Sequence, residues 1–104
     1  MEDKRPRLTS QSLRVLREVL SRPLDELSGA DIARSTSIPS GTLYPILLRL
    51  ESAGWLNSRW EELDPHEAKR PRRRLYKLTA LGQQEAYMEF KKIEPVWGNL
   101  AWQS

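Results

Sequence analysis

The chain has no cysteine, a single histidine and no long apolar run, and each shortage excludes a class of protein. Without cysteine there is no disulfide framework and no thiolate metal site. No stretch approaches the roughly 18 to 20 apolar residues of a membrane-spanning helix, and the N-terminus lacks the apolar segment of a secretory signal. We therefore expect a cytoplasmic protein with no membrane segment.

Motifs for catalysis are also missing. The chain has no glycine-rich phosphate loop, no nucleophile motif and no metal-ligand spacing. Its histidine, His66, stands in a polar segment beside Pro65 and Glu67, where a lone histidine is typical of a solvated side chain. We predict that the protein is not an enzyme and binds no metal or cofactor.

One segment carries the positive charge of the chain, whose 104 residues suffice for a single domain. The net charge is +3, from 17 cations and 14 acids, but residues 68–84 hold six of the cations and no acid. The other 11 cations are outnumbered by the 14 acids of the remaining chain. Such clustering is the electrostatic footprint of nucleic-acid binding, because each neutralised phosphate releases a counterion, although solvated loops share this composition.

The N-terminal part predicts a short arm and two helices. Residues 1–8 are polar and basic and form a flexible basic arm. A helix begins near Thr9 or Ser10, either of which can cap its first turn, and ends before Pro23. A second helix, about two turns long, opens with a capping box at Ser28–Asp31.

The stretch from Ser40 to Gly54 predicts the helix around which the chain is organised. Its strongest apolar residues follow the i, i+3, i+4, i+7 spacing of one buried face. They are Leu43, Ile46, Leu47 and Leu50. The opposite side is small, hydroxylated or cationic and poor in acids; Ser40 can cap the helix, and Pro45 predicts a slight bend. A short helix, a tight turn and this helix predict a helix-turn-helix.

Two segments with β-prone aromatic residues, 55–62 and 73–79, predict the strands of a hairpin. In the first strand, Leu56 and Trp60 share a side. Residues 63–72 between the strands are too long and too polar for a tight turn, so the hairpin carries an extended basic tip. Three helices followed by this hairpin predict a winged helix, a mainly α fold with a two-stranded β-wing.

From Thr79 the sequence turns helical again, with an apolar stripe that continues into a tryptophan-rich end. Pro95 predicts a kink or an end of this helix at about Glu94. Exposed tryptophans are unfavourable on a monomer, so a second copy of the chain covers the stripe, or the tail folds back on the first helix. The predicted dimer residues are Phe90, Ile93, Trp97, Leu100 and Trp102. The expected parts are the arm at 1–8, a winged helix-turn-helix DNA-binding domain at 9–79 and a C-terminal helical dimerisation segment at 80–104.

Two motifs together resemble a known family. One is Ser40 to Leu56, which contains Gly-Thr-Leu-Tyr-Pro and Arg-Leu-Glu, and the other is Tyr-Lys-Leu-Thr-Ala-Leu-Gly at residues 76–82. Over about residues 10 to 95 the chain is similar to the PadR family of bacterial transcriptional regulators. It departs from many members by Gly29-Ala30-Asp31 in place of Gly-Tyr-Glu. Its short C-terminal part resembles the small subfamily with one terminal helix.

The resemblance implies a winged helix-turn-helix that binds operator DNA as a homodimer, usually as a repressor, with the C-terminal helix as the dimer element. It also implies that Thr42 and Tyr44 touch DNA and that the arginine-rich tip is the wing. From the residues themselves, Ser40 and the helix N-terminus can hold a phosphate, and Arg49 can reach a phosphate or a base edge. The predicted DNA-binding residues are Ser40, Thr42, Tyr44, Arg49, Lys69, Arg70, Arg72 and Arg73. A dimer that places helix 40–53 in the major groove predicts a palindromic operator.

Several assignments stay open from the sequence alone. Leu48 faces either a thymine methyl group or the second helix, and Arg74 either joins the DNA-binding surface or pairs with an acid of the hairpin, such as Glu61. Trp97 and Trp102 either pack together or stack on a small aromatic effector. The alternative function is a winged-helix protein-interaction module whose basic wing docks an acidic protein partner.

Overall fold

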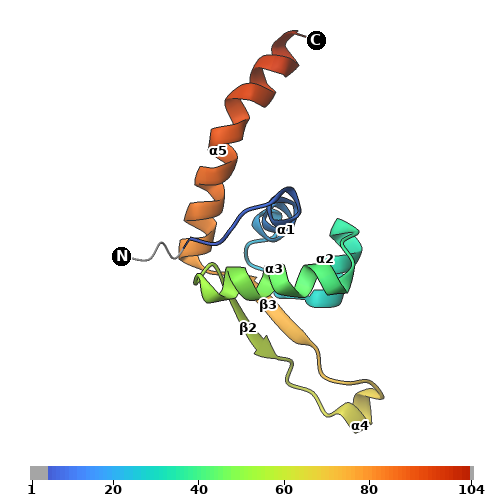
Figure 1. The fold of residues 1–104 in the computed structure, drawn as a ribbon. Coiled ribbons are helices and arrows are strands. Elements are labelled where there is room, and N and C mark those ends of the chain that lie inside the picture. The colour runs from blue at the N-terminus through green and yellow to red at the C-terminus, as the bar shows by residue number, and fades with distance from the viewer. Residues whose placement is uncertain (1–4, 104) are drawn as a thin grey trace.

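The computed structural model describes the backbone of residues 5–103 and the side chains of residues 5–93. Helices and a small sheet form the body, from which a hairpin and the C-terminal helix project in different directions (Figure 1). In chain order the elements are α1 (Ser10–Ser21), β1 (Leu27–Ser28), α2 (Gly29–Thr36), α3 (Ser40–Ser52), β2 (Leu56–Trp60), α4 (Pro65–Ala68), β3 (Arg74–Leu78) and α5 (Ala80–Gln103). The mainly α fold with a β-wing is therefore confirmed, with one strand and one short helix that the sequence analysis did not place.

Side-chain caps explain where the first two helices begin. Thr9 caps α1 by accepting a hydrogen bond from a first-turn N–H at 3.1 Å, and Ser28 with Asp31 forms the predicted capping box of α2. The start of α3 differs from the prediction. Pro39 occupies the capping position and no side chain caps the helix, so Ser40 is its first residue rather than its cap. The first N–H groups of α3 are consequently not covered by a capping side chain.

The sheet has three antiparallel strands in the order β1-β3-β2. β2 and β3 form the predicted hairpin, with Leu56 opposite Leu78 and Trp60 opposite Arg74. β1 adds to the other edge of β3 through Leu27 and Ser28. A strand of two residues is too short to show an alternating pattern of apolar residues. The sequence analysis therefore predicted two strands and missed β1.

The core lies between α1, α2, α3, the sheet and the first turns of α5, and α3 supplies its centre. The four residues predicted to face inward from α3 are all buried, namely Leu43, Ile46, Leu47 and Leu50. Burial of each such side chain stabilises the fold by about 2 kcal/mol. Pro45 does not interrupt α3, which continues from Ser40 to Ser52. At the other end of α3, Gly54 has a φ of +80°, the left-handed conformation that lets the chain leave a helix.

A tight junction connects α3, β2 and α5. Thr79 donates its hydroxyl to the carbonyl oxygen of Gly54 at 2.6 Å and accepts from the N–H of Gly82 at 2.9 Å, which caps α5 as predicted. Gly82 packs directly against the chain at Trp55, because a Cβ at residue 82 would lie 2.0 Å from the Trp55 carbonyl oxygen. Only glycine permits this approach of the two backbones.

α5 continues from Ala80 to Gln103, so of the two alternatives predicted for Pro95, a kink or an end at about Glu94, the end is wrong. Pro95 removes one main-chain hydrogen bond, and the helix proceeds past it. Phe90 packs against the edge of the core and Ile93 is half-buried. The other predicted dimer residues, Trp97, Leu100 and Trp102, have side chains outside the described residues. Within the described part of the chain, no helix is long and apolar enough to cross a bilayer.

The tip of the hairpin contains the short helix α4, where the sequence predicts only an extended polar tip. Asp64 caps this helix by accepting the N–H of His66 at 2.9 Å, and Lys69 ends it in the left-handed conformation with a φ of +56°. His66 is exposed, in agreement with a solvated side chain. α4 therefore folds the tip back on itself and presents its polar side chains to solvent.

Candidate nucleic-acid interface

The outer face of α3 is exposed along its length. Leu48 is 64% exposed and Tyr44 is 47% exposed. Ser40, Thr42 and Arg49 are exposed as well, so the predicted α3 residues share one accessible face. Leu48 points outward, as its interpretation as a base contact requires.

The N-terminus of α3 combines free N–H groups with open space. The N–H groups of Thr42 and Leu43 both donate to the Pro39 carbonyl oxygen, at 3.0 and 2.9 Å. Those of Ser40 and Gly41 have no acceptor within the helix, and the helix dipole adds partial positive charge at this end. A Cβ at Gly41 would meet nothing within 4 Å. A phosphate can therefore approach this backbone closely.

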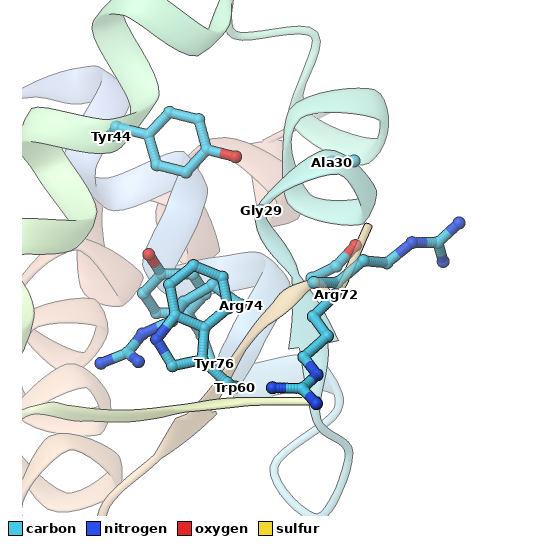
Figure 2. Close-up of a pocket in the computed structure, with 9 residues that line it drawn as sticks. Gly29, Ala30, Tyr44, Trp60, Arg72, Arg74 and Tyr76 are labelled. Atoms are coloured by element: carbon cyan, nitrogen blue, oxygen red, sulfur yellow. The ribbon is translucent and has the colours of Figure 1, made fainter. Parts of the chain in front are cut away.

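Tyr44 extends from α3 toward the start of α2. Figure 2 shows its hydroxyl pointing toward Gly29. A Cβ at Gly29 would lie 2.6 Å from the Tyr44 hydroxyl oxygen, so the absence of a side chain there lets the ring occupy this position. The tyrosine thus links the α3 face to the first turn of α2.

Glu61 lies at the base of the wing and forms an ion pair with Arg70, one of the predicted DNA-binding cations. The Arg70 guanidinium donates to both Glu61 carboxylate oxygens, at 2.7 and 3.0 Å, and the N–H of Arg73 donates to the same carboxylate at 3.2 Å. Hydrogen bonding to Arg70 lowers the pKa of Glu61, and the same contact raises the pKa of Arg70. Arg70 therefore lies in a bidentate ion pair, so a phosphate would have to compete with Glu61 for it.

The three other predicted wing cations, Lys69, Arg72 and Arg73, are exposed. Arg72 donates its Nε to the Leu63 carbonyl oxygen at 2.9 Å, which fixes the side chain to the hairpin. None of the three takes part in a side-chain ion pair among the ion pairs found between described residues. Their charges stay available to an anionic partner.

Arg74 pairs with an acid of α3, not with the hairpin acid Glu61. Its Nη2 lies 3.9 Å from the Glu51 carboxylate, and its Nε donates to the Ser58 hydroxyl at 3.0 Å. Ser58 in turn donates to Glu51, and the Arg74 guanidinium lies over the Trp60 ring, 5.2 Å from its centroid. Suggesting Glu61 as the partner was wrong, because the fold brings the C-terminal half of α3 against this face of the hairpin. The wing and α3 are thereby held together by polar contacts.

A groove lies between the first turn of α2, Tyr44 of α3 and the base of the wing, and we refer to it as the α2–wing groove. Its volume is about 540 Å³. It is lined by Ser28, Gly29, Ala30, Tyr44, Trp60, Arg72, Arg73, Arg74 and Tyr76 (Figure 2). No acid lines it among the described residues. The groove joins the exposed face of α3 to two of the predicted wing cations.

Several residues of this groove were not candidates from the sequence. Trp60 shares a side of β2 with Leu56 as predicted, but Leu56 is buried whereas Trp60 is 59% exposed at the edge of the groove. Alternation along a strand predicts which face of the sheet a side chain lies on, but it does not predict whether the core reaches that side chain. Tyr76 carried only the signal of a strand residue, and Gly29 only that of the glycine that this chain shares with the Gly-Tyr-Glu motif.

A helix-turn-helix followed by a β-hairpin, with an exposed second helix and cations on the hairpin, is the winged helix-turn-helix class of protein. The model of the transcriptional regulator PadR-like family matches residues 24–87, more than half of the chain. The chain belongs to the PadR-like family of transcriptional regulators. This family consists of regulators and not of enzymes. Among curated proteins, none matches the chain.

Solved structures share the fold. MepR of Staphylococcus aureus, in its complex with DNA, is 18% identical with a TM-score of 0.75, and the match covers 93% of this chain and 66% of MepR. The smu.1704 protein of Streptococcus mutans is 28% identical with a TM-score of 0.65, covering 82% of this chain and 80% of that one. A transcriptional regulator homologue of Pyrococcus horikoshii is 19% identical with a TM-score of 0.70, covering 86% and 81%. The chain spans 66% of the length of MepR.

Proposed function

We propose that this chain is a sequence-specific DNA-binding regulator, acting in the cytoplasm as a repressor, that binds a palindromic operator as a homodimer. The observation that carries the proposal is the α2–wing groove, where the exposed face of α3 and wing arginines border one surface that no acid lines among the described residues. A polyanion is the partner that such a surface attracts. The MepR complex with DNA adds support from the same fold.

In this proposal α3 enters the major groove. The open N–H groups of Ser40 and Gly41 hold a phosphate, and Thr42 adds a hydroxyl contact. Arg49 and Leu48 lie further along the exposed face, where they reach a phosphate or base edges. Among the described residues, no packing contact explains the absence of a side chain at Gly41, and close approach of a DNA backbone supplies a reason.

The wing follows the DNA backbone or an adjacent minor groove with Lys69, Arg72 and Arg73. Arg70 joins them only if it leaves its ion pair with Glu61. Pairing of two α5 helices supplies the dimer, with Phe90 and Ile93 as the members of the predicted interface whose side chains are described. A small aromatic effector that stacks on Trp97 and Trp102 is part of the proposal, and quenching of tryptophan fluorescence by candidate aromatics tests it.

The test compares two duplexes, one from the DNA upstream of the chain's own coding sequence and one of random sequence. We expect binding to the upstream duplex to be tighter by at least about 1000-fold at physiological salt. Arg49→Ala should weaken the upstream complex most, whereas Lys91→Ala on α5 is a control for the loss of a cation outside the interface. Equal affinity for both duplexes would contradict the proposal and favour the protein-interaction module.

A further inference from the structure

The free polar groups of the α2–wing groove are hydrogen-bond donors without acceptors. Tyr76 is only 7% exposed, lines the groove, and its hydroxyl makes no hydrogen bond to any described residue. Burial raises its pKa, as do the neighbouring Glu51 carboxylate and Tyr44 hydroxyl, so the group stays a neutral donor at pH 7. No enclosed side-chain oxygen or nitrogen of the described residues lacks a hydrogen-bond partner, so the Tyr76 hydroxyl is reached by solvent and is open to an acceptor in the groove.

The first turn of α2 adds a backbone donor to the same space. The Ser28 hydroxyl accepts the N–H of Asp31 at 3.0 Å, which leaves that of Ala30 without an acceptor within the helix, whereas the pairing of Ser28 with Leu75 directs the N–H of Gly29 to β3. Both Gly29 and Ala30 line the groove, and the Tyr44 hydroxyl lies beside Gly29. The N–H of Ala30 and the two tyrosine hydroxyls belong to residues that line one space, which suits a group that only accepts hydrogen bonds.

The charges around the groove have the sign that an oxyanion needs. Arg72, Arg73 and Arg74 line it, and the nearest acids are occupied elsewhere. Asp31 accepts from the backbone N–H of Ser28, and Glu51 is bound by Ser58 and Arg74. The groove therefore offers donors and positive charge without a competing carboxylate among its lining residues.

The size and the apolar walls of the groove indicate which oxyanion fits. A volume of about 540 Å³ exceeds a free phosphate several times, and the rings of Tyr44 and Trp60 border it. Flat apolar faces on both sides of a donor cluster suit a phosphate that carries sugar rings. We propose that the α2–wing groove holds one phosphodiester of the DNA with its flanking deoxyriboses, and that Tyr76 and Tyr44 donate hydrogen bonds to the phosphate.

This inference rests on the proposed function and adds a contact that lies between α3 and the wing. A phosphate there ties the DNA strand to α2, α3 and β3 at once. It also gives the hydroxyl of Tyr76 an acceptor, which the described residues do not provide. The contact is independent of sequence, because a phosphate carries no base information.

Removal of a single oxygen atom tests the inference. Tyr76→Phe should bind the upstream duplex about tenfold more weakly, as expected for a lost hydrogen bond to a charged group. The variant should unfold at the same urea concentration as the wild type or a higher one, because the hydroxyl has no partner in the free protein. The dependence on salt should stay unchanged, since no ionic contact is lost. Tyr87→Phe, at an exposed tyrosine of α5, is the matched control and should alter neither measurement.

A second measurement locates the phosphate. A series of upstream duplexes, each with one neutral methylphosphonate in place of a phosphate, is titrated against the wild type and Tyr76→Phe. At one position the methylphosphonate should weaken the wild type but add little to the loss already caused by Tyr76→Phe. Gly29→Ala, which displaces the Tyr44 hydroxyl, should show the same lack of additivity at that position.

Either of two results overturns the inference. One is a Tyr76→Phe variant that binds as tightly as the wild type while Arg49→Ala binds weakly, which would leave the proposed function intact. The other is a Tyr76→Phe variant that is clearly less stable, because the hydroxyl would then have a partner inside the protein. Failure of the proposed function is separate, and equal binding of the upstream and random duplexes by the wild type reveals it.

Discussion

The start of α3 and the start of α5 each contain a glycine in the first helical turn, but for opposite reasons. At Gly82 a Cβ would lie 2.0 Å from the backbone oxygen of Trp55, so packing within the chain excludes any side chain. At Gly41 a Cβ would meet nothing within 4 Å, and no packing within the described residues excludes a side chain. One glycine is explained by the fold, and the other calls for a partner outside it. Of the four predictions below, Gly82→Ala and Gly41→Ala test this difference directly, and the other two test the partner and the ion pairs of the wing.

The largest effect is expected for Gly82→Ala. The new Cβ would collide with a main-chain carbonyl group that a side-chain rotation cannot move, so α5 must shift from its place on the core. We expect the free energy of unfolding to fall by about 3 kcal/mol, at the upper end for overpacking. Urea denaturation measures it, with Gly41→Ala as the matched control that shows no loss. An unchanged midpoint for Gly82→Ala would contradict the close packing.

The next effect concerns DNA binding by the wing. Replacing Arg72 and Arg73 together by alanine should reduce the slope of log affinity against log salt by about 0.9 for each lost phosphate contact. Arg70→Ala should reduce this slope by clearly less than about 0.9, because Glu61 compensates that charge before DNA arrives. Fluorescence anisotropy at several salt concentrations measures both. A full reduction of about 0.9 for Arg70→Ala would show that Arg70 leaves its ion pair when DNA binds.

Gly41→Ala should move stability and DNA affinity in opposite directions. Alanine is the better helix former and finds free space, so the free energy of unfolding should rise by about 0.5 kcal/mol. The added methyl group keeps a phosphate away from the helix N-terminus, so the upstream duplex should bind several-fold more weakly. Ser52→Ala, at an exposed position of the same helix, controls for a surface change. A variant that binds as well as the wild type would remove the argument for close backbone approach.

The smallest effect is the loss of folding stability that we expect when the pH is lowered. The pKa values of Glu61 and Glu26 are lowered by hydrogen bonds from Arg70 and Arg59, and that of Asp31 is lowered because hydrogen bonds from Ser28 outweigh its burial. Groups with a lowered folded-state pKa stabilise the fold above their ordinary pKa values, near 4.5 and 3.8, and lose this contribution as the pH falls. Thermal unfolding between about pH 6 and pH 3 should show a shallow loss, because exposed ion pairs contribute little. Glu61→Gln should flatten this pH dependence, and a steeper one would contradict the assignment.

Local patterns were sufficient to predict most of the fold. The buried leucines of α3 follow a helical period, and the Ser28–Asp31 capping box depends on residues three positions apart. The hairpin and the winged-helix arrangement followed from the order of such segments. Each of these features is determined by neighbours along the chain.

Features that depend on distant segments could not be predicted. The pairing of β1 with β3 joins residues 27 and 76, and the contact of Arg74 with Glu51 depends on how α3 lies against the hairpin. The bidentate pair of Arg70 and Glu61 depends on the shape of the tip. The place of Tyr44 at the groove depends on Gly29, where the absence of a side chain leaves room for the tyrosine ring. None of these contacts leaves a periodic signal in the sequence.

Because α5 is held at Gly82, near its N-terminal end, a small rotation there produces a large displacement at its C-terminal end. The helix has 24 residues, so at 1.5 Å per residue it is about 36 Å long, and its N-terminal end is fixed to Trp55 between α3 and β2. A rotation of about 5° at this joint therefore moves the far end by about 3 Å. If two copies pair through α5, small differences in packing at one glycine decide how far apart their α3 helices stand.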